Sequence, residues 1–266
     1  MRRLFHSFCV WIGCLCGLSI LVSCNDGVAT STPIIGITNV EDGERVELSK
    51  YVSAIIQAGG IPVILPITTN YEASCKALER VDGLLLSNGA RVSPRWTEPN
   101  QIDSSDVLLR RDTFEIRLAQ KAVAMGYPIL GINRGSLILN MAMGGTIYQD
   151  VLKEVGSDVI HSNETGKGNK HEISISSGNW LGDLFSNKTQ EVHSNHKQGV
   201  KYLASCFSKV ATSKDNLCEI YIGGDELYIG VQYDVEEDIY SNDGSGSKIL
   251  NHFVKKACYF AERYKQ

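Results

Sequence analysis

Short apolar runs alternate with longer helical segments through the first half of this sequence, and that order limits the folds open to the chain. Each run has the length and composition of a buried parallel strand, and each intervening segment is long enough for a crossover helix. The order predicts right-handed crossovers and a mainly parallel sheet with helices on both faces, an α/β sandwich of three layers. The expected strands are residues 33–38, 61–65, 83–86 and 128–132, and the expected helices are residues 48–58, 71–80 and 105–125.

The second half carries short strand-like segments that follow one another too closely for crossover helices. Residues 213–216, Ser-Lys-Asp-Asn, have the composition of a hairpin turn between two of them. We therefore expect an antiparallel extension of the sheet, followed by a closing helix over residues 247–264. The segments expected to form the extension are residues 171–176, 191–194, 209–213, 217–222 and 228–232.

The N-terminus has the organisation of an export signal. Arg2 and Arg3 precede an apolar stretch over residues 4–22, and Ser23 ends it. This pattern predicts a signal peptide over residues 1–23. Polar residues interrupt the stretch, which makes a retained membrane helix the weaker alternative.

The residues at the end of this signal also predict a lipid anchor. Leu-Val-Ser-Cys at 21–24 resembles a bacterial lipobox, so Cys24 is the expected lipidation site, with an ordinary secreted protein as the alternative. A polar tether over residues 24–32 and a single domain over residues 33–266 follow. The expected location is therefore that of an exported, membrane-anchored lipoprotein, in the periplasm or on the cell surface.

Charge and cysteine spacing exclude several classes of function. The net charge is −4 and no long basic run is present, so nothing predicts nucleic-acid binding. Cys75, Cys206, Cys218 and Cys258 show no C-x-x-C spacing, so they encode neither a zinc site nor a redox motif. An exported protein could form disulfides, but the sequence does not pair these cysteines.

Four histidines, His161, His171, His193 and His196, suggest a metal site at first sight. The last two are three residues apart, but they fall on an expected strand end or loop and not on one face of a helix. No carboxylate completes a ligand set at a recognisable spacing. The sequence therefore predicts no metal.

Residues 128–135 carry the pattern on which catalysis would depend. A buried strand runs into a turn flanked by Gly131 and Gly135 and then into a helix over residues 136–143, the geometry of a nucleophile elbow. A thiol at the centre of such a turn lies beside a helix N-terminus, which lowers its pKa and makes it a good nucleophile. The central residue here is Asn133, whose amide is not a usable nucleophile.

Six segments together give the chain a specific family resemblance. They are residues 33–38, 58–66, 82–86, 111–115, 128–135 and 144–150. With them the chain resembles the γ-glutamyl-γ-aminobutyrate hydrolases, which are γ-glutamyl hydrolase-type members of the class I glutamine amidotransferase superfamily. The resemblance covers nearly the whole chain after the tether. It implies a flavodoxin-like fold, a γ-glutamyl or amino-acid-like ligand and no cofactor.

The resemblance assigns a catalytic triad to three positions, of which one is retained. The family's cysteine nucleophile matches Asn133, and the histidine and glutamate of its Gly-Val-Gln-aromatic-His-Pro-Glu segment match Asp234 and Glu236. Asp234 is a weak base at neutral pH, because an ordinary aspartate has a pKa of about 3.9. The resemblance therefore implies a site that has lost its nucleophile and base and has kept its orienting carboxylate.

Positions around the triad are partly retained. The family's glycine-rich oxyanion loop matches Ser87-Asn88-Gly89, in which Asn and Gly both tolerate the backbone conformation that the hole needs. Leu137 replaces a glutamine, which removes a polar substrate contact, and we expect Arg111 and Glu115 to form a solvated helix ion pair. The positions that the resemblance places against substrate or oxyanion are Asn88, Gly89, Arg134, His196 and Gln198.

Two functions follow as hypotheses. The first is a pseudoenzyme whose inherited pocket binds a γ-glutamyl or other amino-acid-like ligand, or a protein partner. The second is a hydrolase of γ-glutamyl amide or isopeptide bonds with a rearranged catalytic set such as Glu236, Asp234 and His196. The missing thiol favours the first, and fold analogy does not decide because function belongs to the site.

The lipobox yields the first testable prediction. Wild-type protein should partition with membranes and carry acyl chains on Cys24, because several chains on one residue anchor a protein stably. Cys24→Ala should abolish lipidation. Mass spectrometry of the mature N-terminus decides the matter, and an unmodified N-terminus at any other residue would contradict the prediction.

Overall fold

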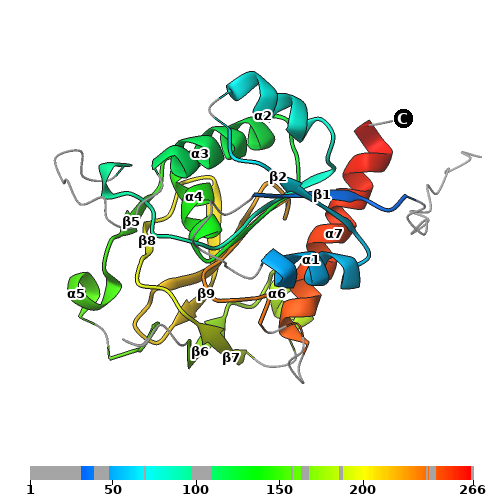
Figure 1. Ribbon diagram of the computed structural model, residues 1–266. Coiled ribbons are helices and arrows are strands. Elements are labelled where there is room, and N and C mark those ends of the chain that lie inside the picture. Colours follow the sequence, from blue (N-terminus) through cyan, green and yellow to red (C-terminus); the bar gives the residue numbers. More distant parts are fainter. Residues whose placement is uncertain are drawn as a thin grey trace, which may run out of the picture.

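A nine-stranded sheet organises the chain (Figure 1). The computed structural model describes residues 31–38, 48–68, 70–96, 109–156, 158–162, 168–185, 188–237, 239 and 244–264. The strand order across the sheet is β2-β1-β3-β4-β11-β10-β9-β6-β7. The expected signal peptide and Cys24 lie outside the described residues.

One half of the sheet is parallel. Strands β2, β1, β3, β4 and β11 pair in parallel in that order, which is the flavodoxin-like order that the family resemblance implies. These strands are short and almost fully buried at the centre of the sheet, as expected for strands covered by helices on both faces. Their bounds are β1 Ile34–Thr38, β2 Ile61–Leu65, β3 Gly83–Leu86, β4 Ile129–Ile132 and β11 Tyr228–Val231.

The other half is antiparallel, as predicted, with one correction. The turn at 213–216 does connect two antiparallel strands. Residues 228–232 were expected to belong to the antiparallel extension, but β11 runs parallel to β4 and antiparallel to β10, so it joins the two halves. The antiparallel strands are β6 Asn169–Ile175, β7 Thr189–Ser194, β9 Phe207–Ser213 and β10 Cys218–Gly223.

A small second sheet was not predicted. It pairs β5, Thr146–Tyr148, with β8, Gly199–Tyr202, in antiparallel orientation. Residues 144–150 carry a family motif, and the sequence predicts no strand there. The pair lies against helix α4, Arg134–Ala142; β5 follows α4 along the chain, and β8 connects β7 to β9.

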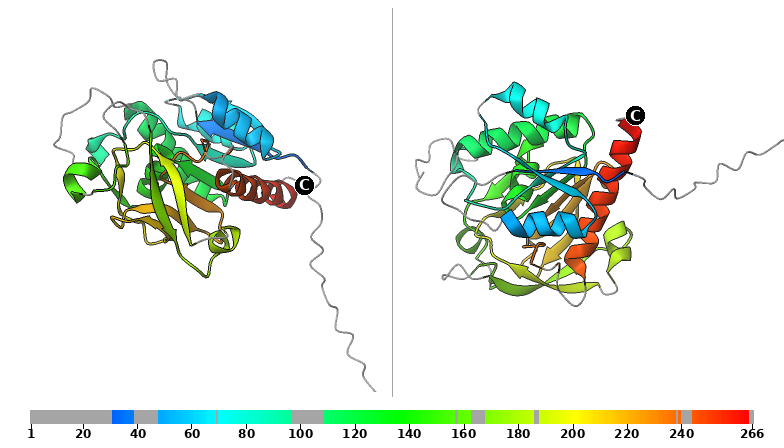
Figure 2. Two further views of the ribbon diagram at one scale, coloured as in Figure 1. Left: turned by 90° about the horizontal axis from the view of Figure 1, so that it is seen from below. Right: turned by 45° about the vertical axis from the view of Figure 1, so that its right-hand side comes forward.

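Helices cover both faces, so the molecule has the three layers expected (Figures 1 and 2). Each face of the sheet has its own hydrophobic core, and successive residues of a central strand point into opposite cores. Leu85 packs with α1 and α7, whereas Leu84 and Leu86 pack with α3 and α4. The first face carries α1 Leu48–Gln57, α6 Trp180–Leu184 and α7 Ser245–Tyr264; the second carries α2 Tyr71–Leu78, α3 Leu109–Ala124 and α4; α5 Val151–Val155 and the 3₁₀ turn η1 Pro94–Trp96 lie in connections. Among the described helices, none is both long and apolar enough to cross a membrane.

Candidate functional site

The three triad-equivalent residues meet at the carboxyl edge of the parallel strands. Asn133 follows β4, and Asp234 and Glu236 follow β11, its parallel neighbour. The loop with Asn88 and Gly89 follows β3, which flanks β4 on the other side. Open α/β sheets bind their ligands at this edge. Five of the residues singled out from the sequence therefore gather in one place.

Asn133 has the backbone of a nucleophile elbow. Its φ of 50° and ψ of −109° lie in a region that a non-glycine residue adopts only under strain. The flanking glycines are required by close packing: a Cβ on Gly131 would lie 2.6 Å from the Gly135 oxygen, and one on Gly135 would lie 1.9 Å from the Leu86 oxygen. The elbow geometry has thus been kept although the thiol is absent.

A hydrogen bond joins the nucleophile and base positions. Asn133 Nδ2 donates to Asp234 Oδ1 at 2.8 Å and lies 3.3 Å from the carbonyl oxygen of Asn195. Asn88 Nδ2 lies 3.5 Å from the same Asp234 oxygen, at the limit of a hydrogen bond. The Asp234 carboxylate therefore receives two side-chain amides. His193, which the sequence analysis considers only as a metal ligand, also lies here, with its Nδ1 3.7 Å from Asp234 Oδ2.

The retained carboxylate, Glu236, has a different partner from the one its family role requires. Tyr51 on α1 donates its hydroxyl to Glu236 Oε1 at 2.6 Å. Burial, and then the charge of Asp234, raise the pKa of Glu236 to about 8, while the Tyr51 hydrogen bond lowers it less strongly. Glu236 is therefore largely protonated at neutral pH, whereas an orienting residue would have to accept from an imidazole.

Arg111 orients the expected oxyanion loop. Its Nη2 donates to the carbonyl oxygens of Ser87 and Asn88, at 3.2 and 2.9 Å. In a trans peptide the N–H points away from the carbonyl, so the N–H groups of Asn88 and Gly89 turn toward the site. Both have partners there: the Tyr51 hydroxyl, 3.3 Å from the Asn88 nitrogen, and Asn88 Oδ1, 2.7 Å from the Gly89 nitrogen. The orientation of the hole persists, but its donors are occupied.

The charges beneath the elbow form a buried network. Arg111 and Glu115 were expected to be a solvated pair, which is wrong, because both side chains are fully buried with Arg111 Nε 3.0 Å from Glu115 Oε1. Arg134, expected against substrate, instead pairs with Asp112 and Glu115. Burial raises the pKa of Glu115, but the charges of Arg111 and Arg134 outweigh it and hold this pKa below its usual value. The four charges balance, and they fix α3 to the first turn of α4.

Two further positions from the sequence analysis, Gln198 and Leu137, contribute to the fold. Gln198 accepts from the Val92 N–H at 2.7 Å and donates to the Val92 oxygen at 2.8 Å, so it pins the loop after β3. Leu137 is buried in the core between the sheet and α3, so this position offers no contact to a ligand. Gln198, expected against a ligand, is therefore bound within the protein, whereas the buried Leu137 agrees with the expectation that a polar contact is lost at that position.

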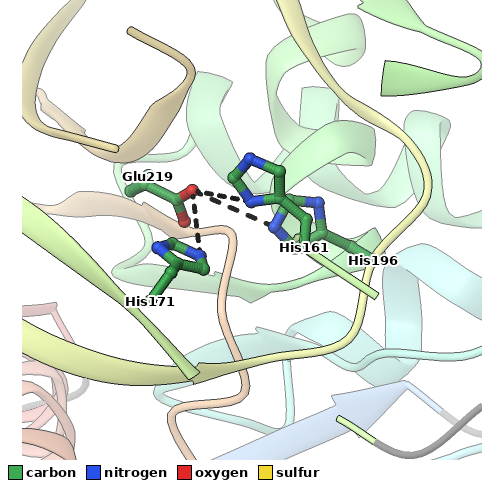
Figure 3. Close-up of side chains that lie close together, drawn as sticks. All are labelled: His161, His171, His196 and Glu219. Carbon is green, nitrogen blue, oxygen red and sulfur yellow. Dashed lines mark ion pairs between the residues drawn. The ribbon is translucent and has the colours of Figure 1, made fainter. Parts of the chain in front are cut away.

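His196 was also expected at the pocket, but its imidazole lies in a second, separate group. Together with His161, His171 and Glu219 it forms a buried cluster that could hold a metal ion (Figure 3). No carboxylate lies at a recognisable sequence spacing from these histidines, but the fold brings Glu219 beside three of them. Burial, and then the charge of His161, lower the pKa of His171 to about 4, and the same causes lower that of His196. Burial, and then the charge of Asp215, raise the pKa of Glu219 to about 8.

Comparison with known proteins places this geometry in a family. A model of the Peptidase C26 family matches residues 27–236, most of the chain. The chain belongs to this family. Protein NtpR of Enterococcus hirae is 30% identical over 239 residues, covering 84% of this chain and 99% of that protein. The gamma-glutamyl-gamma-aminobutyrate hydrolase PuuD of Escherichia coli is 28% identical over 242 residues, covering 86% and 94%.

Solved structures of other proteins share the fold of this Peptidase C26 family member. A glutamine amidotransferase from Thermotoga maritima superposes with a TM-score of 0.55 at 14% identity, covering 85% of this chain and 98% of that one. At this identity the likeness shows the fold alone. The expected membership of the γ-glutamyl hydrolase-like class I glutamine amidotransferases and the expected α/β fold are therefore confirmed.

The buried network predicts a large loss of stability on removal of one charge. Glu115→Gln should lower the free energy of unfolding by about 3–5 kcal/mol, because it leaves two buried guanidinium groups with one carboxylate. Glu72→Gln is the matched control, since Glu72 and Lys76 have the same i,i+4 spacing but are 77% and 70% exposed. The control should change stability by less than about 0.5 kcal/mol. Urea unfolding measures both, and equal losses would show that burial does not set the strength of the pair.

Glu236 predicts a pH-dependent contribution to stability. A buried carboxyl whose pKa is raised from 4.5 to about 8 stabilises the fold fully below pH 4.5, and that stabilisation is lost as the pH rises to 8. Glu236→Gln should therefore gain stability relative to wild type between pH 5 and pH 8, as followed by urea unfolding. Tyr51→Phe should lose more stability than wild type as the pH rises, because it removes the hydrogen bond that lowers the pKa of Glu236. If the difference in unfolding free energy between Glu236→Gln and wild type did not change with pH, the raised pKa of Glu236 would be contradicted.

Proposed function

We propose that this protein is an exported lipoprotein of the Peptidase C26 family that binds a γ-glutamyl or amino-acid-like ligand and does not hydrolyse it. The observation that carries the proposal is the hydrogen bond between Asn133 and Asp234. The positions that hold nucleophile and base in the family lie within reach of each other, but they hold an amide and a carboxylate. Neither group can attack a carbonyl carbon and pass a proton as a thiol and an imidazole do.

No neighbouring side chain in the described part of the molecule takes over the nucleophile's place. The Ser136 hydroxyl is buried and donates to the carbonyl oxygen of Asn133 at 2.7 Å. Cys218 lies on β10, and burial raises the pKa of its thiol to about 12, so it is not a reactive thiolate. The other cysteines in the described residues, Cys75, Cys206 and Cys258, do not follow β3, β4 or β11.

The alternative hydrolase requires Glu236, Asp234 and His196 to act together. That set is not supported, because His196 Nε2 faces Glu219 at 4.0 Å and its Nδ1 lies 2.8 Å from the Gln198 oxygen. The His193 imidazole lies 3.7 Å from the Asp234 carboxylate, so any residual hydrolysis would use it in place of His196.

The polar groups at the elbow support a ligand with amino and carbonyl groups. Asp234 offers a carboxylate to an ammonium group, and the amides of Asn133 and Asn88 can exchange their bonds to it for bonds to a ligand carboxylate or amide. Displacing Asn88 would also release the Gly89 N–H for a ligand oxygen. The lipid on Cys24 would keep this binding site at the membrane surface.

Restoring the triad tests whether the scaffold has lost only its reactive groups. Wild type should show no hydrolysis of γ-glutamyl amides above background. Asn133→Cys and Asp234→His should each restore little, whereas the double variant should exceed the product of the single effects in kcat/KM by about 10²-fold or more, because the two groups act as a unit. Asn133→Ala with Asp234→His is the control without a thiol and should stay at background.

Two outcomes would contradict the proposed function. Robust wild-type turnover that His193→Ala abolishes and Asn133→Ala leaves intact would establish a rearranged hydrolase. If no compound in a panel of γ-glutamyl compounds raised the wild-type Tm, the proposed class of ligand would be wrong. Binding to the native state alone must raise stability. Asn88→Leu is the matched variant for a compound that does bind, and it should reduce the shift.

A further inference from the structure

Three histidines and a glutamate gather in the antiparallel half of the molecule, and none of them is a triad position. His171 lies on β6 and Glu219 on β10, while His161 and His196 come from connecting segments. Their side chains are at most 6% exposed, and that of Glu219 is fully buried. Figure 3 shows the three imidazoles around the Glu219 carboxylate.

One nitrogen of each ring approaches the same carboxylate oxygen. His161 Nδ1, His171 Nε2 and His196 Nε2 lie 3.4, 3.5 and 4.0 Å from Glu219 Oε1. With one ligand atom taken from each residue, all four atoms lie within 4.8 Å of one another. Two ligands of a tetrahedral zinc ion, each about 2.1 Å from the metal, are separated by about 3.4 Å. The four side chains therefore have nearly the spacing of a four-coordinate metal site.

The opposite nitrogen of each ring faces an acceptor. His161 Nε2 lies 2.9 Å from Asp215 Oδ2, and His196 Nδ1 lies 2.8 Å from the Gln198 carbonyl oxygen. His171 Nδ1 has a longer contact, 3.4 Å, to its neighbour's carbonyl oxygen. Carboxylates and carbonyls only accept, so the outer nitrogens carry hydrogens, and each inner nitrogen can give its lone pair to a metal ion that takes the place of any inner proton. Metal-binding histidines are held in this way by carboxylates and backbone carbonyls.

The inner face of the group is formed by three ring nitrogens and a carboxylate, all of which can be metal ligands. Within the described residues, no hydrogen bond reaches the three inner nitrogens or either oxygen of Glu219. The Ser213 hydroxyl donates to Asp215 at 2.5 Å. Buried lone pairs that face a carboxylate are unfavourable unless positive charge lies between them. The arrangement therefore calls for a cation at its centre.

We propose that these four residues, the His₃Glu cluster, bind a divalent transition-metal ion, for which zinc is the best match. Imidazole nitrogen and carboxylate oxygen are ordinary zinc ligands, and four protein ligands leave no open coordination position. The site is thus structural. It ties β6 and β10 to the segments that carry His161 and His196.

The ion would also hold in place the segment Asn195–His196, which contacts Asn133. His196 donates its backbone N–H to the His161 oxygen at 3.0 Å, and the preceding residue, Asn195, offers its carbonyl oxygen to Asn133. An entry path exists, because His161 and His196 line a cavity of about 460 Å³. Leu152 and Ile160 line the same cavity and are exposed, so it opens to the surface.

Metal content and metal-linked stability test the proposal on the full-length protein, solubilised in detergent and purified without a polyhistidine tag. Elemental analysis should find about one zinc ion per chain, as expected for a single closed site. Chelation should lower the Tm, and one equivalent of zinc chloride should restore it, because an ion that binds the native state alone raises its stability.

Substitutions locate the ion. Glu219→Gln and His171→Gln each remove a ligand while keeping a polar side chain, and each should weaken zinc binding by more than about 100-fold, since loss of an outer partner alone typically costs 10–100-fold. Asp215→Asn changes only such an outer partner and should fall within that range. His252→Gln is the control, because His252 stacks on Trp180 outside the cluster, and it should bind zinc as wild type does.

A second measurement uses only wild-type protein, so it does not depend on whether the metal-ligand variants fold. Cobalt added to chelated wild-type protein should produce the visible absorption of tetrahedral coordination, and zinc should abolish it. Folded protein that carries no metal after growth with added zinc, and that shows neither a Tm shift with zinc nor a cobalt spectrum, would overturn the proposal. Protons would then supply the charge at the centre of the cluster.

Discussion

The buried charges beneath the elbow are the constraint on which the rest of the site depends. No member of this network can lose its charge without leaving a partner uncompensated in the core. Arg111 also holds the carbonyl oxygens of the loop after β3, while Arg134 is the first residue of α4. One network therefore fixes the loop, the helix and the turn between them. Asn133 keeps its strained backbone because these surroundings over-determine it.

Much of the fold could be predicted from the sequence because its signals are local. Each parallel strand is a continuous apolar run followed by a helix, and the composition of residues 213–216 by itself predicts a hairpin turn. The direction of β11 could not be read in this way. Its residues look like those of any short strand, and only its place in the sheet shows that it runs parallel to β4 on one side and antiparallel to β10 on the other.

The site was predictable only where a linear motif carries it. Asn133, Asp234 and Glu236 follow directly from such motifs, and the structure brings them together. Burial does not show in spacing, so Arg111 and Glu115 resemble a surface pair although they are fully buried. The His₃Glu cluster has no motif, because β6 and β10 are not neighbours in the chain. The antiparallel sheet brings Glu219 to the histidines through pairing of both strands with β9.

Within the described residues, the open nine-stranded sheet ends at β2 and at β7, and each edge could recruit a strand from another copy of the protein. The outer strands discourage this in different ways. At one edge, β2 contains Pro62, which has no N–H to donate to an added strand. At the other, β7 exposes the polar residues Thr189 and Glu191, the second of which is charged. The sheet is thus built to end where it does, which keeps copies held close together from joining edge to edge.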